Sequence, residues 1–573
     1  MATDNYWLRN RSRFGRRRVL QAAASASVGL AGLAAVGCGD DDDDTSGSSP
    51  TAAGATTAPT PAEQADLTAT LTAGIGSDIG SGDPQSLAGT GGGNWPSYAT
   101  HFITPLTTNR DTSEVVGYAA DWEWADNNTA ILLKAKPGLK FHNGEPINAA
   151  QFKFNIDREL GRAEYNPKFA SGHKSQFTSI GEVSIVDELT ARLEVIQPDV
   201  ILPSKLAGSM FLVPKDYVVA KGDTEFGANP VGAGPFKFES RTADSQIKSV
   251  RYDDFFYGRD QQFGPRLPWI QTLVQKVIPE DAARIAALET GEIDLAHNVS
   301  ADLAKSFEGR SGFKVYSLPG DQPMHIHINT MLETGEGGGP NPWRDVRVRK
   351  AANLAVDLDT IIKTILTGTE KRSFGSAQRS LGFPQDLPAK QFKYDPAAAK
   401  ALLAEAGYAD GFTTSLNYPT GRWPNTEAVV QAVANYLGKV GIKANLQAQQ
   451  YQVTTTAFKQ KTSPGLTFFG MSGGDDPGPN FRYGYHSKGA YTMSTDPALG
   501  LDALIEQSEA AFDVEKRKAL IGQIITKFYE NASWIFLYEP VTIAIADDKK
   551  LQWTYYNKVL SNPEYWNIKV VKS

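Results

Sequence analysis

Cysteine is nearly absent from this chain: Cys38 is the single cysteine among 573 residues. The rest of the chain therefore has no partner for a disulfide bond, no thiol nucleophile and no cysteine ligand for zinc. These absences exclude disulfide-stabilised folds, cysteine-dependent enzymes and zinc-finger domains for everything that follows residue 38.

Long hydrophobic runs and an excess of positive charge are missing as well. Beyond residue 37 no stretch reaches 18 consecutive apolar residues, so no later transmembrane helix is expected. The 57 Lys and Arg are outnumbered by 64 Asp and Glu, and the formal net charge of −7 argues against a nucleic-acid partner. Neither a G-x-x-x-x-G-K-S/T phosphate loop nor an H-E-x-x-H zinc motif occurs, and we expect no cofactor.

The N-terminus has the composition of an export signal followed by an attachment point. Three arginines, 16–18, precede an uncharged stretch rich in Ala, Gly and Ser that ends at Cys38. A basic head, a weakly apolar body and small residues before a cut site are typical of a signal peptide, and paired arginines indicate the twin-arginine route. The segment 35–38 resembles a bacterial lipobox, with Ala35 where Leu is usual. We therefore expect residues 1–37 to be removed and Cys38 to be lipidated, which would anchor the protein to the outer face of a cytoplasmic membrane.

The alternative is an uncleaved membrane anchor, because the stretch before Cys38 is just long enough to span a bilayer. Five aspartates, 40–44, follow this cysteine, and then a segment rich in Thr, Ala, Pro, Gly and Ser. Such a composition cannot bury enough apolar surface to fold. We expect 38–66 to be a solvated tether, with a folded body that begins near residue 67.

Strand and helix signals are mixed along this body, without a repeat period. A helix at 397–406 is marked at both ends, by Asp395 and Pro396 before it and by Gly407 after it. The other expected elements are strands at 67–71 and 131–133, a strand at 140–144 that runs into an Asn-Gly turn, a helix at 426–437, a strand at 442–450, helices within 501–529 and a β-rich segment at 534–546. This mixture predicts an α/β fold, and the length has room for two or three domains.

One pattern typical of a catalytic site occurs. Residues 470–474 fit the G-x-S-x-G motif, with Ser472 at its centre, and a strand-like segment precedes them. Two prolines and a glycine at 477–479 are poor starts for the long helix that follows such a serine in hydrolases. His486 is the single histidine downstream. We therefore expect no enzyme, and a serine hydrolase using Ser472 is the less favoured alternative.

Two histidines alternate on an expected strand. His325 and His327 are two residues apart, so they share one face of that strand. Two imidazoles can bind a metal ion, but no third ligand lies near them in sequence. We expect no metal site, and a receptor for a metal or metal chelate using this pair is kept as an alternative.

Five segments, in chain order, resemble the signatures of the family 5 extracellular solute-binding proteins, which are the oligopeptide-, dipeptide- and nickel-type receptors of ABC importers. They are KFHNGEPINA at 140–149, NPVGAGPF at 229–236, GEID at 291–294, DVRVRKA at 345–351, and YDP with LLAEAGY at 394–396 and 402–408. The matches extend over nearly the whole body, from about residue 67 to 571.

The resemblance implies an α/β, two-lobed periplasmic-binding-protein clamshell of class II, of the large cluster C type, with an extra subdomain in the N-terminal lobe. Residues 67–324 would form the first lobe with its inserted subdomain, 325–538 the second lobe, and 539–573 would return to the first lobe. The implied function is an extracytoplasmic receptor that delivers a peptide or another small organic solute to an ABC importer. Its implied partners are the solute, the permease subunits and, through the lipid, the membrane, and we expect a monomer. Capture by closure needs contacts and no catalytic residue.

One departure from the family bears on the solute. Peptide-binding members carry an acidic residue four positions before the proline of their Asp-Pro loop, and it pairs with the α-ammonium group of the peptide. Here the proline is Pro477 and that position is Gly473, although Asp475 and Asp476 lie close in sequence. The resemblance therefore leaves the solute open among peptides, saccharides, opine-like compounds and other small organic molecules.

Aromatic residues in Gly- and Pro-rich loops are the best candidates for contacts with the solute, because rigid amphipathic rings suit recognition. We expect Trp95 from the first lobe and Trp423, Asp475 and Tyr485 from the second to line the cleft. The rings would cover apolar parts of the solute, and the carboxylate would hold a donor or a cation.

Overall fold

The computed structural model divides the chain into two units, Met1–Gln64 and Ala65–Ser573, and describes most of the second. The described residues are 65–86, 95–109, 114–162, 166, 168–255, 268–320, 322–376, 378, 380–471, 476–553 and 565–571. The expected signal, Cys38 and the tether therefore lie outside the described residues. Within the described residues, none of the helices combines the length and the apolar character needed to cross a membrane.

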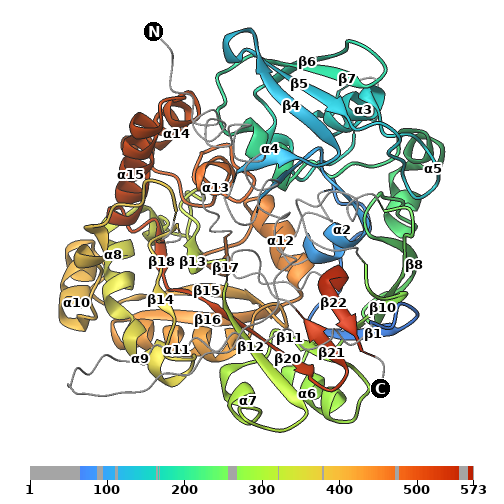
Figure 1. The fold of residues 1–573 in the computed structure, drawn as a ribbon. Helices are drawn as coiled ribbons and strands as arrows, with labels where there is room; N and C mark the ends of the chain where they lie inside the picture. Colours follow the sequence, from blue (N-terminus) through green and yellow to red (C-terminus); the bar gives the residue numbers. More distant parts are fainter. Residues whose placement is uncertain are drawn as a thin grey trace, which may run out of the picture. The chain divides into compact units, whose positions relative to one another are not determined.

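The largest sheet is built from both ends of the described chain. Its strands, in spatial order, are β12 (Phe313–Pro319), β20 (Val541–Asp547), β11 (Leu295–His297), β1 (Thr70–Ile75), β10 (Thr272–Val277), β9 (Gln246–Arg251) and β8 (Phe236–Thr242). Strand β1 runs parallel to β10 and β11, and β20 inserts antiparallel between β11 and β12 (Figure 1). A strand from the C-terminal part is therefore integral to the sheet that the N-terminal part begins.

Both faces of this sheet are covered, as the alternation along β20 shows. Ile543 and Ile545 pack with helices α6 (Asp281–Glu289) and α7 (Ala301–Lys305). Ala544 and Ala546 face the opposite way and pack with aromatic residues of the C-terminal segment. This two-sided burial follows from the period of two along a strand, and it accounts for the apolar run through β20.

A four-stranded antiparallel sheet forms the extra subdomain. Its order is β4 (Ala120–Ala125), β5 (Ala130–Ala135), β7 (Thr190–Val195) and β6 (Ile180–Ile185). Helix α3 (Ala149–Leu160) packs on this sheet. Its N-cap is Asn148, whose side chain accepts a hydrogen bond from the Gln151 amide, and its C-cap is Gly161, which has a left-handed backbone conformation. The connecting helices are α2 (Trp95–His101), α4 (Leu202–Gly208) and α5 (Lys215–Ala228), and a two-stranded ribbon joins β2 (Leu106–Thr108) to β3 (Val115–Gly117).

The third large sheet has five strands and helices on both faces. Its order is β16 (Ile442–Gln449), β15 (Phe412–Pro419), β17 (Leu466–Gly470), β13 (Met324–Ile328) and β18 (Trp534–Phe536). One face packs with α8 (Val346–Ala355), α9 (Leu358–Thr364), α10 (Pro396–Glu405) and α11 (Thr426–Lys439). The other face packs with α12 (Tyr451–Lys459), α13 (Gly478–Gly484), α14 (Leu501–Glu509) and α15 (Val514–Glu530).

Two chain crossings connect the seven-stranded and five-stranded sheets. One leads from β12 to β13, and the other from β18 through β19 (Tyr538–Glu539) to β20. The crossings run side by side, because the Gly320 amide donates to the Pro540 carbonyl at 2.7 Å. We call the seven- and four-stranded sheets with their helices the first lobe, and the five-stranded sheet with its helices the second lobe. The expected α/β two-lobed fold is confirmed, and the exact domain boundaries stay a prediction.

Most of the predicted elements are present, and two differ for local reasons. At α10 the Asp395 side chain accepts a hydrogen bond from the Ala398 amide, and Gly407 has a φ of 90°, as the capping pattern predicts. The strand expected from residue 67 begins only at Thr70, because the Asp66 carboxylate accepts hydrogen bonds from the amide and hydroxyl of Thr68 and turns the chain there. The prediction of a strand at 140–144 is wrong, because the Asn-Gly turn is flanked only by an isolated bridge between Lys140 and Pro146.

Candidate functional site

The carboxyl ends of parallel strands in the two lobes face each other. Gly76 follows β1 in the first lobe, and Gly421 follows β15 in the second. A Cβ added at Gly76 would lie 2.4 Å from the Gly421 carbonyl oxygen, so the two loops are in backbone contact. Nearby, the Gln452 side-chain Nε2 donates to the backbone carbonyl of Asp78 at 3.3 Å. Open α/β sheets bind ligands beyond the carboxyl ends of their strands, so these facing edges are the candidate site.

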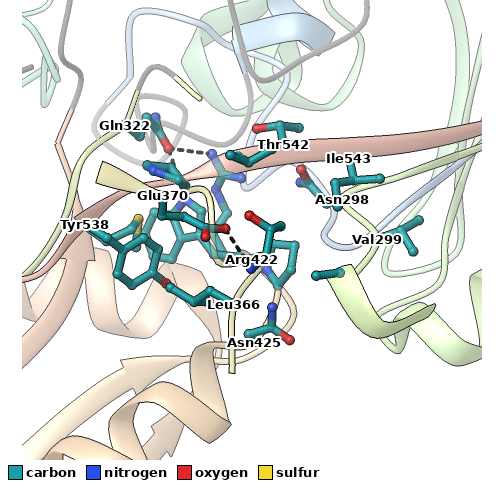
Figure 2. A pocket seen from close by; sticks show the side chains of 17 residues that line it. Asn298, Val299, Gln322, Leu366, Glu370, Arg422, Asn425, Tyr538, Thr542 and Ile543 are labelled. Carbon is teal, nitrogen blue, oxygen red and sulfur yellow. Dashed lines mark hydrogen bonds between the residues drawn. The ribbon is translucent and has the colours of Figure 1, made fainter. Parts of the chain in front are cut away.

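A cavity of about 40 Å³ lies where these edges meet the chain crossings (Figure 2). Asn298, Val299 and residues 541–543 line it from the first lobe, and Glu370 and the loop 422–425 line it from the second. This volume holds a few water molecules. A larger solute therefore requires a wider separation of the two lobes than this structure has.

An arginine and a tryptophan in the cavity wall share one acceptor. The Gln322 Oε1 atom, in the first crossing, accepts from Arg422 Nη2 and from Trp423 Nε1, both at 3.1 Å (Figure 2). Arg422 is 4% exposed, and its guanidinium lies 5.0 Å from the Trp423 ring and 5.7 Å from the Tyr451 ring. The loop after β15 thus presents a buried cation and a half-buried aromatic ring, both oriented by the crossing.

A carboxylate completes the polar wall of the cavity. Glu370 Oε1 accepts from the Thr367 amide at 3.1 Å, whereas its buried Oε2 has no hydrogen-bond partner among the described residues. Tyr538 is adjacent, and burial, reinforced by the charge of Glu370, raises the pKa of its hydroxyl. An unpaired carboxylate oxygen at this place can accept a hydrogen bond from water or from a bound solute.

The structure describes the side chains of two of the four residues predicted to line the cleft, Trp423 and Tyr485. Trp423 lines the cavity. Tyr485 is 3% exposed and its ring stacks on that of Phe528 at 3.8 Å, inside the core of the second lobe. Trp95 begins α2, but its side chain is outside what the structure describes, and Asp475 lies outside the described residues altogether. The last three assignments stay predictions.

Asp476, considered as a substitute for the missing acid, has another role. Its two oxygens accept from Arg517 Nη1 and Nη2, both at 2.6 Å, and Oδ1 also accepts from the Gly478 amide. Arg517 belongs to α15, so the pair fastens the start of α13 to the core of the second lobe. Both oxygens are therefore already engaged. Ser472 and Gly473 lie outside the described residues.

His325 and His327 share a face of β13, as predicted, and both are fully buried. Their rings pack against Trp534, with centroids 4.6 Å and 4.0 Å away. Burial lowers the pKa of His325 to about 3 and also lowers the pKa of His327, so both are neutral at pH 7. The described residues contain no group of three or more His, Cys, Asp or Glu placed to hold a metal ion. The pair packs as part of an aromatic core.

Sequence reasoning missed the polar residues of the cavity, among them Arg422, Gln322 and Glu370. Arg422 had a local signal, because it precedes Trp423 in the Gly- and Pro-rich loop. Gln322 and Glu370 had none, since each reaches the cavity from a different segment of the chain. Only the folding of the crossings places them beside that loop.

Comparisons with known proteins agree with this architecture. Residues 115–493 match the family model described as bacterial extracellular solute-binding proteins, family 5 Middle. The glutathione-binding protein GsiB of Pectobacterium atrosepticum is 24% identical over 456 residues, which is 78% of this chain and 84% of that protein. The match to GsiB of Escherichia coli K12 covers 58% of this chain and 60% of that relative.

Two solved structures have the same fold. One is the binding protein AgaA in complex with agropinic acid, from A. tumefacien R10, with a TM-score of 0.76 and 22% identity over 88% of this chain and 99% of AgaA. The other is DppA from Helicobacter pylori in complex with the peptide STSA, with a TM-score of 0.77 and 20% identity over the same shares. At these identities the likeness concerns the fold.

Proposed function

This chain belongs to the bacterial extracellular solute-binding proteins of family 5, and from that premise we propose that it captures a small solute between its lobes. This solute bears a carboxylate and is a peptide or an amino-acid derivative. The protein would deliver this solute to the permease of an ABC importer. The single observation that supports the solute class is the buried guanidinium of Arg422 at the facing strand ends. The relatives' names give glutathione, a peptide and agropinic acid as ligands, and each is a peptide or an acid.

The physical case for a carboxylate depends on burial. A guanidinium binds a carboxylate through two parallel, charge-assisted hydrogen bonds, which are about twice as strong as neutral ones. Closing the lobes removes water and lowers the local dielectric, which strengthens this attraction further. Trp423 offers a flat ring for an apolar part of the solute, and Glu370 Oε2 offers an acceptor for a donor group.

Replacing Arg422 with Gln is expected to weaken binding of the natural solute by about 10- to 100-fold, because a hydrogen bond to a charged group contributes about 1.5–3 kcal/mol. The solute is first identified by mass spectrometry of what co-purifies with the native protein, and its affinity is then measured by calorimetry. Arg310→Gln is the matched control, because Arg310 is 44% exposed and pairs with Glu289 on α6. Unchanged affinity in Arg422→Gln, or a co-purifying solute without a carboxylate, would contradict the solute class.

We further propose that the receptor acts from the outer face of a cytoplasmic membrane, held by a lipid on Cys38 after twin-arginine export, and that it works as a monomer. The motif at 35–38 and the arginines 16–18 support this proposal, together with the extracellular nature of the family.

Replacing Cys38 with Ala is expected to abolish lipidation, because the thiol is the attachment point, and to move the protein out of the membrane fraction. The measurement is fractionation with immunoblotting, together with mass spectrometry of the N-terminus. Arg16→Lys with Arg17→Lys separates the two steps, since it should block export while Cys38 is intact. A Cys38→Ala protein that is processed and fractionates like the wild type would refute the anchor.

A further inference from the structure

Four charged side chains from both lobes meet in a buried cluster away from the cavity. Asp199 and Lys205 belong to the first lobe, just before and within α4, and Arg482 and Glu509 belong to α13 and α14 of the second lobe. Lys205 Nζ donates to Asp199 Oδ2 at 2.7 Å and to Glu509 Oε1 at 3.3 Å. Arg482 Nε donates to the same Glu509 atom at 3.1 Å. The ion pair of Lys205 with Glu509 therefore joins the lobes.

Each member of this cluster is withdrawn from water. Side-chain exposure is 2% for Asp199, 2% for Lys205, 5% for Glu509 and 13% for Arg482. Although burial raises the pKa of Glu509, the adjacent Lys205 and Arg482 outweigh it and hold that pKa below its ordinary value. Glu509 is therefore ionised at neutral pH, between two cations from different lobes.

Two further contacts join the lobes at the same place. The Val200 amide donates to the backbone carbonyl of Glu509 at 2.7 Å. The ring of Trp124, on the edge strand β4, meets Phe512 of the α14–α15 turn edge-on, with centroids 5.5 Å apart. A backbone bond and an aromatic contact thus flank the ionic cluster, and all three exist only while the lobes are together.

The energetics of such a cluster favour a defined closed state. Each lobe contributes one positive and one negative charge, so either half is neutral when the lobes separate and water enters. In the closed state Glu509 loses its water and depends on Lys205 and Arg482 for compensation. Removing one partner from a buried, hydrogen-bonded charge pair is strongly unfavourable, because the remaining charge stays buried without compensation. Closure is therefore sensitive to each member of the cluster.

We propose that Glu509, with Lys205 and Arg482, is a latch that holds the two lobes of the receptor closed and so sets its open–closed equilibrium. None of the three residues lines the cavity. They are positioning residues, because a solute binds only to the fraction of molecules whose lobe separation admits it, and a latch on the closed state changes that fraction. The inference rests on the clamshell closure of the proposed receptor and is independent of the class of solute.

The test measures closure without any solute. In the chain with Cys38→Ser, no native cysteine is left, so dyes can be placed at Val186→Cys on the first lobe and Glu515→Cys on the second. Both positions are exposed, at 59% and 73%. Single-molecule energy transfer then reports the distance between the lobes, and hydrogen exchange of the peptide containing the Val200 amide reports the backbone bond to Glu509.

Glu509→Gln is expected to lower the ratio of closed to open molecules about tenfold and to speed exchange at Val200 by a similar factor. Lys205→Met, on the opposite lobe, should shift both readouts in the same direction, and it replaces Glu509→Gln if that variant does not fold. Glu506→Gln is the matched control, since it removes the same charge from an exposed position of the same helix.

Distances and exchange rates equal to those of the wild type in both Glu509→Gln and Lys205→Met would overturn the latch. So would an equal shift in Glu506→Gln, because that would indicate a general effect of charge. If the lobes respond as expected but no carboxylate-bearing solute is ever found, the latch stands and the proposed solute class fails.

Discussion

Replacing Arg517 with Gln is expected to lower the free energy of unfolding by about 3–5 kcal/mol, the range for breaking a buried ion pair by removing one partner. The Arg517 side chain is 1% exposed, and it is the bidentate partner of Asp476. Without the guanidinium, the Asp476 carboxylate remains largely buried with a single backbone donor, the Gly478 amide. Urea denaturation followed by circular dichroism measures the effect.

The same variant tests how the loop before α13 is held. Because Asp476 directly follows the segment that contains the predicted site residue Asp475, loss of the pair should also weaken solute binding. Lys518→Gln is the matched control, since it removes a neighbouring cation of α15 that is 40% exposed. If Arg517→Gln lowered the free energy of unfolding by less than about 1 kcal/mol, the size expected for an exposed ion pair, the pair would not stabilise the fold as proposed.

Gly232→Ala is expected to destabilise the first lobe by about 3 kcal/mol, the upper end of the usual range for overpacking, because the added Cβ meets backbone atoms that cannot move aside. A Cβ at this position would lie 1.9 Å from the carbonyl oxygen of His101 and 2.8 Å from the Phe102 ring. The Gly232 carbonyl also accepts from the His142 amide at 2.7 Å, so the loop is fixed from two sides. Thermal unfolding of the purified variant measures the loss.

A second glycine provides the contrast. Gly208 lies in α4, and a Cβ there would meet nothing within 4 Å. Gly208→Ala should therefore leave stability unchanged or raise it by about 0.4–1 kcal/mol through the entropy of the unfolded chain. If both variants unfolded at the wild-type temperature, the close approach to His101 would not explain why residue 232 is a glycine.

The sequence correctly predicted features that depend only on interactions between neighbouring residues. Asp395, Pro396 and Gly407 predicted both ends of α10, because capping bonds and a left-handed φ involve only neighbouring residues. The strand expected at 140–144 failed because a strand exists only when a partner pairs with it, and sequence alternation does not reveal whether one does. Pairing is a tertiary event.

The aromatic residues illustrate the same limit at the site. Trp423 and Tyr485 both occur in loop-like sequence, so nothing local distinguishes them. Packing of α15 buries Tyr485 against Phe528, whereas Trp423 lies in the cavity wall beside the chain crossings. The alternation in β13 correctly put His325 and His327 on one face, but only the helices on that face decided that it is buried.

The sequence alone determined the α/β class, the family and the capped helices, because these depend on short motifs and on residue types. The tertiary structure decided the rest: β20 inserts between β11 and β12, Gln322 and Glu370 meet Arg422, and Glu509 meets Lys205. Each of these contacts joins segments far apart in the chain. Their energy depends on burial and distance, which no local pattern encodes.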